Sequence, residues 1–418
     1  MNEATRQYIL AHADDDVRQL ALQGSRDAAV DLRMALQQIQ GRQTARRKLP
    51  SWAAHDDLLY PAHLSMEQCS SEQTARYKAR VACDSVASII PPVTSRLVDL
   101  TGGLGVDFAF MAPVFQEAVY VEQQPELSAI AQANFATLGL TVTTICGDGI
   151  GYLHQLDKAT LIFLDPARRG GHGGRTYGIS DCTPNVLTIL EELLSKADHV
   201  MIKLSPMLDW RKAVSDVGAE HVEQIHIISV GNECKELLLV ISAKGCECPR
   251  LICKNDNSTE VFPLNPTTPT SPTIPTIPTT PTTPTIPTTP TIPTPPSLIY
   301  LYEPNSSLMK AGLFAELAAR YGVSPLAPNS HLFTSEEYIA HFPGRIFQIA
   351  AVSSMNKQEL KATIQPLRQA NISVRNFPLS VAELRKRLKL TEGGSNYLFA
   401  TTLGNGNHII LVGKKITP

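Results

Sequence analysis

Four acidic side chains follow apolar runs between residues 97 and 165, at places where strands of a sheet are expected to end. Asp99 closes "RLVDL", Glu122 closes "AVYVE", Asp148 follows "TVTTI", and Asp165 closes "LIFLD". The carboxyl ends of parallel strands meet at one edge of a sheet, so the four carboxylates are expected to line one crevice. In that crevice Asp99 suits an ammonium group, Glu122 a pair of ribose hydroxyls, Asp148 an adenine amine, and Asp165 the reacting end.

A turn with little side-chain bulk follows the first acid, in the pattern Asp99-x-Thr101-x-Gly103-x-Gly105. Small residues let the backbone approach a ligand closely. The loop lacks the Gly-Lys-Ser/Thr ending of a P-loop. It also departs from the dinucleotide pattern G-x-G-x-x-G, because Phe108 occupies the third glycine position. The loop therefore indicates a ligand of another class.

Seven apolar runs alternate with helical patterns from residue 97 to about 243, which indicates an α/β domain with a largely parallel, Rossmann-like sheet. Only "GNECKE" separates the last two runs, "IHIISV" and "LLLVISA". This spacing is too short for a crossover helix, so these runs must pair as a hairpin and the seventh strand is expected to be antiparallel.

The remaining sequence divides into segments of different character. Apolar spacing predicts helices over residues 1 to about 50, and "SSEQ" predicts a helix start capped by Ser71 or Ser70. The basic stretch "GRQTARRKLPSW" is expected to be a solvated linker, with a nucleic-acid contact as the alternative. The expected organisation is a helical region (1–80), the α/β domain (81–245), a connecting hairpin (246–262), a disordered Pro/Thr-rich linker (263–296), and two small α+β domains (297–346 and 347–418).

Composition narrows the class of protein. The 418 residues carry a formal net charge of −2, which excludes a globally basic nucleic-acid binder but leaves local basic patches open. The polar N-terminus does not fit a secretory signal, and the sequence has no run of 18 or more apolar residues. A cytoplasmic protein with no membrane partner is therefore expected. The eight cysteines suit reduced thiols better than disulfides, and "CEC" is a poor spacing for zinc, so no metal is predicted.

The ordered set of four acids, followed by an antiparallel last strand, resembles the class I S-adenosylmethionine-dependent methyltransferases. Further segments resemble the bacterial members that carry a THUMP-like C-terminal domain: "LSMEQCSSEQTARYKA", "DLTGGLGVD", "LDPARR", "YLYEPNSSLMKAGLF", "SHLFTSEEYIAHFPGRIF" and "RNFPLSVAELRKRLKLTEGGSNYLFATTL". The resemblance implies S-adenosylmethionine as cofactor. It also implies a ferredoxin-like domain before the THUMP-like domain. The predicted cofactor contacts are Asp99, Thr101, Gly103, Gly105, Glu122, Asp148 and Asp165.

Asp165, Pro166 and Arg168 of "DPARR" are the predicted catalytic residues. The Asp165 carboxylate and the Pro166 carbonyl are acceptors that could orient an amine or a ring N–H beside the methyl group, while Arg168 could clamp a phosphate or pair with a local acid. Carbon methylation of uridine would require a thiolate, for which Cys182 is the nearest candidate, although a structural thiol is the simpler interpretation. His172 could act as a base, and Lys203, Ser205 and Pro206 could complete the acceptor pocket.

THUMP-type domains are associated with RNA, often transfer RNA, so the resemblance implies an RNA partner. Phosphate contacts are expected from basic side chains near the C-terminus: Arg375, Arg385, Lys386, Arg387 and Lys389. A solvated helix face explains the same residues without RNA. The alternatives are a methyltransferase acting on a protein or a small molecule, and a non-catalytic RNA-binding or assembly factor that keeps the fold. The sequence leaves the oligomeric state open.

Overall fold

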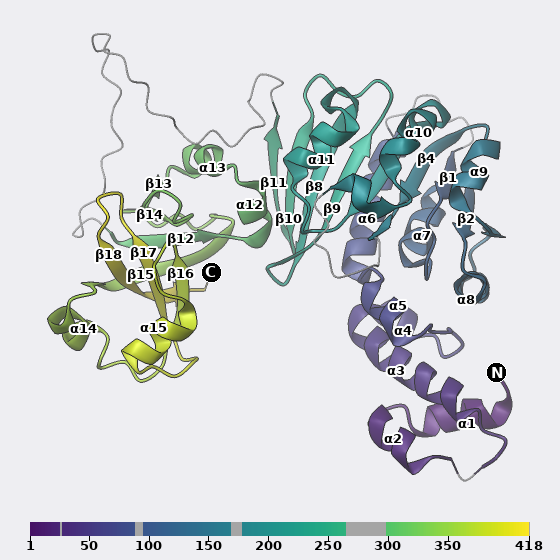
Figure 1. Ribbon diagram of the computed structural model, residues 1–418, viewed down its shortest axis with the longest axis horizontal. Coiled ribbons are helices and arrows are strands. Elements are labelled where there is room, and N and C mark those ends of the chain that lie inside the picture. The colour runs from purple at the N-terminus through teal and green to yellow at the C-terminus, as the bar shows by residue number, and fades with distance from the viewer. Residues whose placement is uncertain (26, 88–94, 169–177, 265–297, 418) are drawn as a thin grey trace. The chain divides into compact units, whose positions relative to one another are not determined.

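The computed structural model describes residues 1–25, 27–87, 95–168, 178–264 and 298–417 (Figure 1). The chain divides into two compact units. The first unit comprises residues 1–230, 235–252 and 261–271, and the second comprises residues 231–234, 253–260 and 272–418. The predicted Pro/Thr-rich linker lies outside the described residues from residue 265 onward.

A nine-stranded sheet has the order β11-β10-β8-β9-β7-β4-β1-β2-β3. Its strands are β1 (Arg96–Asp99), β2 (Glu117–Glu122), β3 (Thr143–Cys146), β4 (Ala159–Leu164), β7 (Ala197–Leu204), β8 (Val222–Val230), β9 (Glu233–Ile241), β10 (Arg250–Asn255) and β11 (Ser258–Pro263). Strands β3, β2, β1, β4 and β7 run parallel to one another. Strand β9 is antiparallel to β7, as predicted.

The predicted number of seven strands is wrong, because β10 and β11 continue the sheet beyond β8. The sequence analysis placed residues 246–262 in a separate connecting hairpin. The backbone of β8 would otherwise form an exposed sheet edge, and pairing with β10 satisfies its hydrogen-bonding groups. Leu251 and Cys253 of β10 are buried, so this pairing also covers apolar surface.

Helices precede the sheet and connect its strands, and a two-stranded ribbon, β5 (Ala167–Arg168) with β6 (Cys182–Thr183), follows β4. The helices are α1 (Glu3–Ala11), α2 (Val17–Gln23), α3 (Leu32–Lys48), α4 (Pro50–Ala53), α5 (His63–Gln68), α6 (Glu72–Ala87), α7 (Val106–Met111), α8 (Pro125–Thr137), α9 (Gly149–Gln155), α10 (Leu190–Lys196) and α11 (Trp210–Val217). The helical N-terminus is confirmed, and Ser71 accepts the Thr74 N–H at 3.3 Å as the predicted cap of α6.

The expected linker at residues 41–52 is wrong, because these residues lie in α3 and α4. Two of the basic side chains of this stretch form ion pairs, Arg42 with Asp56 and Arg46 with Asp14. Lys48 donates to the Met66 carbonyl at 2.8 Å and so fastens α3 to α5. Lys48 thus contributes to helix packing, and Arg42 and Arg46 pair with acids of neighbouring turns, which a count of charges along the sequence does not reveal.

The second unit contains a seven-stranded sheet in the order β13-β14-β12-β15-β18-β17-β16. Its elements are β12 (Tyr300–Pro304), α12 (Ser306–Ala311), α13 (Phe314–Tyr321), β13 (Ser324–Pro325), β14 (Phe333–Ser335), β15 (Gly344–Ser354), α14 (Lys357–Thr363), β16 (Asn371–Arg375), α15 (Val381–Leu388), β17 (Asn396–Thr402) and β18 (His408–Ile416). A capping box between Ser380 and Glu383 starts α15. The boundary predicted after residue 346 falls within β15.

Within the described residues, no helix has the length and apolar character required to cross a membrane.

Stability of the first unit is expected to depend on pH through His226 of β8. The ring is buried and its Nδ1 lies 2.9 Å from the Tyr77 hydroxyl of α6, and burial lowers the pKa of His226 from 6.5 to about 3. The unfolded chain therefore takes up a proton below about pH 6.5 while the folded protein does not. The free energy of unfolding should fall by about 1.4 kcal/mol per pH unit as the pH drops from there toward about 3.

Urea unfolding at pH 7.5, 6.5 and 5.5 measures this effect. Both tryptophans of the chain, Trp52 and Trp210, are buried in the first unit, so their fluorescence follows its unfolding. The His226→Leu variant is expected to have a shallower pH dependence than the wild type. Equal slopes in the two proteins would contradict the assignment.

Candidate active site

A cavity of about 670 Å³ opens in the first unit at the carboxyl ends of β1, β2, β3 and β4. Its wall includes all of the predicted cofactor-binding residues: Asp99, Thr101, Gly103, Gly105, Glu122, Asp148 and Asp165. The volume falls within the range of small-molecule sites. The sheet therefore brings together side chains that are spread over 67 positions of the sequence.

Backbone N–H groups of the neighbouring turns hold the acids in place. Glu122 accepts from Gly103 and from Gln124, each at 2.7 Å, one on each carboxylate oxygen. Asp148 caps α9 by accepting from Gly151 at 2.8 Å. Each carboxylate oxygen can still accept a further hydrogen bond, because one donor occupies only one of its lone pairs.

Asp99 and Thr101 fix the turn after β1. The buried Asp99 carboxylate accepts the Thr101 N–H at 2.9 Å, and the Thr101 hydroxyl accepts the Asp165 N–H at 2.6 Å. Thr101 thus joins the ends of β1 and β4. Burial raises the pKa of Asp99 well above its ordinary value, and the nearby charge of Asp107 adds to that rise.

Two glycines of the loop have positive φ, which explains their residue type. Gly105 has φ +78°, and a Cβ there would lie 2.5 Å from the Phe135 ring. Gly103 has φ +57°, and a Cβ there would meet nothing closer than the Thr101 carbonyl at 3.9 Å. The loop is therefore tightly packed at Gly105, and at Gly103 the backbone has open space beside it.

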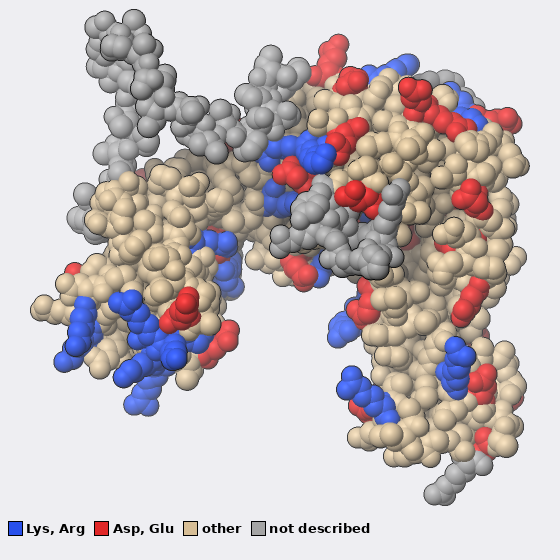
Figure 2. All heavy atoms as spheres, viewed as in Figure 1, with Lys and Arg blue, Asp and Glu red and all other residues tan. Residues whose placement is uncertain are grey.

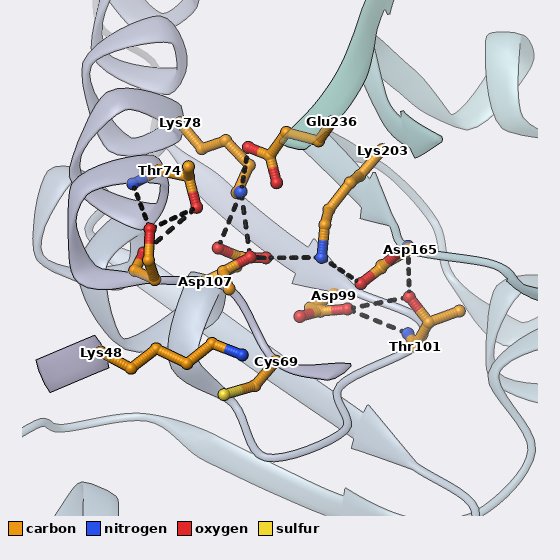
Figure 3. A network of polar contacts seen from close by, with 12 residues as sticks. Lys48, Cys69, Thr74, Lys78, Asp99, Thr101, Asp107, Asp165, Lys203 and Glu236 are labelled. Carbon is orange, nitrogen blue, oxygen red and sulfur yellow. Dashed lines mark hydrogen bonds and ion pairs between the residues drawn. The ribbon is translucent and has the colours of Figure 1, made fainter. Parts of the chain in front are cut away.

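A chain of ion pairs runs from the buried side chains of Lys78 and Glu236 to Asp165 at the cavity (Figure 3). Lys203, near the end of β7, places its ammonium 2.6 Å from Asp165 and 3.6 Å from Asp107. Lys78 of α6 lies 3.1 Å from Asp107 and 2.5 Å from Glu236 of β9. The Ser70 hydroxyl donates to Asp107 at 2.7 Å. These contacts join α6, α7, β7 and β9 around one end of the cavity.

The predicted catalytic residues are described only in part. Asp165 and Pro166 line the cavity, as do Cys182, Ser205 and Pro206 from the wider predicted pocket. Arg168 has its backbone in β5, but its side chain lies outside the described part of the structure. Residues 169–177 as a whole lie outside the described part, so the role of His172 stays a prediction.

The sequence analysis missed Lys78, Asp107, Glu236 and Cys69. Cys69 lines the cavity from the turn between α5 and α6. A signal for two of these positions was present in the sequence: "DLTGGLGVD" ends on Asp107, and Glu236 is an acid directly before the apolar run "LLLVISA". Their pairing with Lys78 depends on tertiary packing.

The sheet order, the antiparallel last pair and the strand-end acids define an S-adenosylmethionine-dependent methyltransferase. The chain is 31% identical to a Porphyromonas gingivalis W83 protein whose crystal structure is assigned to a methyltransferase, with 99% of this chain and 98% of that one covered and a TM-score of 0.79. It is 21% identical to an uncharacterised S-adenosylmethionine-dependent methyltransferase of Mycobacterium tuberculosis, over 82% of this chain and 84% of that protein.

Two family models match the C-terminal part of the chain. Residues 300–343 match a ferredoxin-like domain and residues 344–415 a THUMP domain-like model. The chain therefore belongs to the family of S-adenosylmethionine-dependent methyltransferases with ferredoxin-like and THUMP-like C-terminal domains.

Cofactor affinity is expected to rise with pH through Asp99. The protein without cofactor keeps a proton on Asp99 to higher pH than an ordinary aspartate, because the pKa of this carboxyl is raised. A cation bound beside Asp99 favours the ionised form, so binding should release a proton and tighten as the pH rises from about 4 through the raised pKa.

Titration calorimetry of S-adenosylmethionine binding at several pH values above about 4, in buffers of different ionisation enthalpy, measures the released proton. The Asp99→Asn variant keeps the acceptor for Thr101 and should bind without that release. Identical apparent enthalpies in all buffers for the wild type would refute the coupling.

Proposed function

We propose that this enzyme methylates RNA in the cytoplasm, with transfer or ribosomal RNA as its substrate. The observation that carries the proposal is the uneven distribution of charge. The segment matched by the THUMP domain-like model, residues 344–415, contains eleven Lys and Arg and three acidic residues, a net charge of +8. The rest of the chain contains 26 Lys and Arg and 36 acidic residues. A local basic segment in an acidic protein favours a polyanionic partner.

Side chains near α15 are the proposed phosphate contacts. Figure 2 shows Lys and Arg gathered at the part of the second unit that carries α15. Lys386, Arg387 and Lys389 are exposed, and their side chains form no ion pair with any described residue. Such unpaired, exposed cations can exchange counterions for phosphates at little cost.

Arg375 and Arg385 have other partners. Arg375 lies 3.0 Å from Glu303, and Arg385 donates to the Ala370 carbonyl at 3.2 Å and lies 3.8 Å from Glu392. Their guanidinium groups hold parts of the second unit together. The proposed RNA contacts therefore centre on Lys386, Arg387 and Lys389, with Arg375 and Arg385 in supporting positions.

In the first unit, we assign the cofactor to the cavity at the ends of β1 to β4. Asp99 and the loop with Thr101, Gly103 and Gly105 would hold the methionine part, Glu122 the ribose hydroxyls, and Asp148 the adenine amine. The fit rests on donor and acceptor chemistry: these carboxylates are acceptors, and the corresponding cofactor groups are donors. The bound cofactor supplies an electrophilic methyl group. Asp165 and Pro166 would align the acceptor atom with it.

Nucleoside mass spectrometry of transfer and ribosomal RNA tests the substrate. Cells that lack the protein are expected to lose one methylated nucleoside. The wild-type protein should restore it and the Asp165→Ala variant should not. If the methylated nucleosides of both RNA fractions are unchanged, the acceptor is a protein or a small molecule and the RNA proposal fails.

RNA affinity is expected to depend on the cations of α15. Replacing Lys386, Arg387 and Lys389 by Gln removes three phosphate contacts, so the slope of log affinity against log salt should become shallower by about 2 to 3. Fluorescence anisotropy with bulk transfer RNA, over about 50–200 mM KCl, measures this slope.

A matched control removes the same charge from the first unit: Arg18, Lys158 and Lys244, all exposed, are replaced by Gln. This variant should keep the wild-type slope. Equal slopes for the α15 variant and the control would contradict the assignment of the RNA-binding surface.

A further inference from the structure

Lys203 is a buried cation at the end of the cavity where the acceptor is proposed to bind. Its side chain is 11% exposed, and its ammonium lies 2.6 Å from the Asp165 carboxylate. Burial by itself would lower the pKa of Lys203, but the adjacent carboxylates, Asp165 first and Asp107 next, raise it above the ordinary value. Lys203 therefore stays charged and occupies one oxygen of Asp165.

A second carboxylate, Asp107, holds the ammonium of Lys203 in addition to Asp165. Asp107 contacts both Lys203 and Lys78, and Lys78, which is fully buried, also pairs with Glu236 at 2.5 Å. Burial opposes the ionisation of Asp107, yet Lys78 and Lys203 together lower its pKa. The alternating charges leave Lys203 little freedom to move, so one oxygen of Asp165 is fixed and the other is left to accept a hydrogen bond.

Two thiols lie in the described part of the cavity wall, Cys69 and Cys182, and the second is buried in β6. Among the described residues of the wall none is a histidine. The Cys69 thiol donates to the Met66 carbonyl at 3.2 Å, and burial raises its pKa to about 11, so it remains protonated near neutral pH. A hydroxyl acceptor requires a base and a pyrimidine carbon acceptor requires a thiolate. A neutral nitrogen requires neither.

We propose that Lys203 positions Asp165, and that the methyl acceptor is a nitrogen carrying at least one N–H, such as the exocyclic amine of a nucleobase. The position of the cofactor in this cavity and the choice of a nucleobase both rest on the proposed function. The nitrogen lone pair forms the bond to the methyl carbon as the carbon–sulfur bond breaks, and that electron pair stays on sulfur. The nitrogen, now positively charged, then releases its proton to water.

Asp165 accepts the hydrogen bond from the acceptor N–H and stabilises the positive charge that develops on the nitrogen. Lys203 touches neither reactant in this scheme and acts through Asp165. The pairing also sets the charge at this end of the cavity: without Lys203, Asp165 and Asp107 would lack its compensating charge.

Two cofactor analogues test the role of Lys203 without a substrate. Sinefungin carries an ammonium group at the place of the methyl sulfonium, whereas S-adenosylhomocysteine is neutral there. The ratio of the Kd for S-adenosylhomocysteine to the Kd for sinefungin should rise about tenfold in Lys203→Met, which corresponds to about 1.4 kcal/mol. The ratio should stay within about twofold of the wild type in Lys203→Arg, because the charge is kept.

Asp165→Asn is the second variant, since removal of Lys203 could unfold the protein. Asp165 is 40% exposed, and its replacement should lower the same ratio. Tryptophan fluorescence confirms that each variant is folded. An unchanged ratio in folded Lys203→Met would overturn the role of Lys203. An unchanged ratio in folded Asp165→Asn would overturn the role of the pair.

Transfer of a labelled methyl group to the RNA, protein and small-molecule fractions of cells lacking the enzyme tests the acceptor atom. The labelled product is expected to be an N-methyl group in whichever fraction carries it. A C-methyl or O-methyl product would overturn the inference. Label in the protein or small-molecule fraction would overturn only the RNA proposal, so the two failures are distinguishable.

Discussion

A fully buried lysine constrains the first unit. Lys78 has no exposed side-chain surface, and its ammonium is compensated by Asp107 and Glu236. Breaking such a buried pair by removing one partner costs about 3–5 kcal/mol, because the remaining charge is left in a low-dielectric environment. Helix α6 therefore has to lie where α7 and β9 can both reach it. The N-terminal helices are thereby coupled to the cavity.

The same arrangement determines the charge of the cavity. Among the described residues that line it, six are acidic, Asp99, Asp107, Glu122, Asp148, Asp165 and Glu236, and two are lysines, Lys203 and Lys235. An excess of acids suits a cationic ligand. The acids are not equivalent, however. Asp107 is compensated by lysines, whereas Asp99 is buried with no ion pair to any lysine that the structure describes, and its pKa is raised. Electrostatic compensation thus separates Asp107, which is paired within the fold, from Asp99, the acid proposed to respond to a cationic ligand.

Sequence reasoning succeeded where local pattern and topology decide. Parallel strands must end at a common edge, so the four strand-end acids could be placed in one cavity before the structure was known. It failed where residues far apart in the sequence form contacts. Lys78 and Glu236 are 158 residues apart, and neither flanks a glycine loop. The pairing of β10 with β8 depends on an otherwise open sheet edge, and the basic residues of α3 could be understood only through their partners.

In the second unit, Arg375 already has a partner within the fold. Glu303 of β12 is 4% exposed and accepts from two guanidinium groups, Arg345 of β15 at 2.7 Å and Arg375 of β16 at 3.0 Å. Glu303 lies in the segment matched as ferredoxin-like, and both arginines lie in the THUMP-like segment. One buried carboxylate therefore ties the two segments together, in addition to their shared sheet. A phosphate that captured Arg375 would have to compete with that carboxylate, whereas Lys386 and Arg387, which face solvent, require no such exchange. Basic residues that support the fold and basic residues available to a polyanion are thus distinguished by their partners, although the sequence presents them as one cluster.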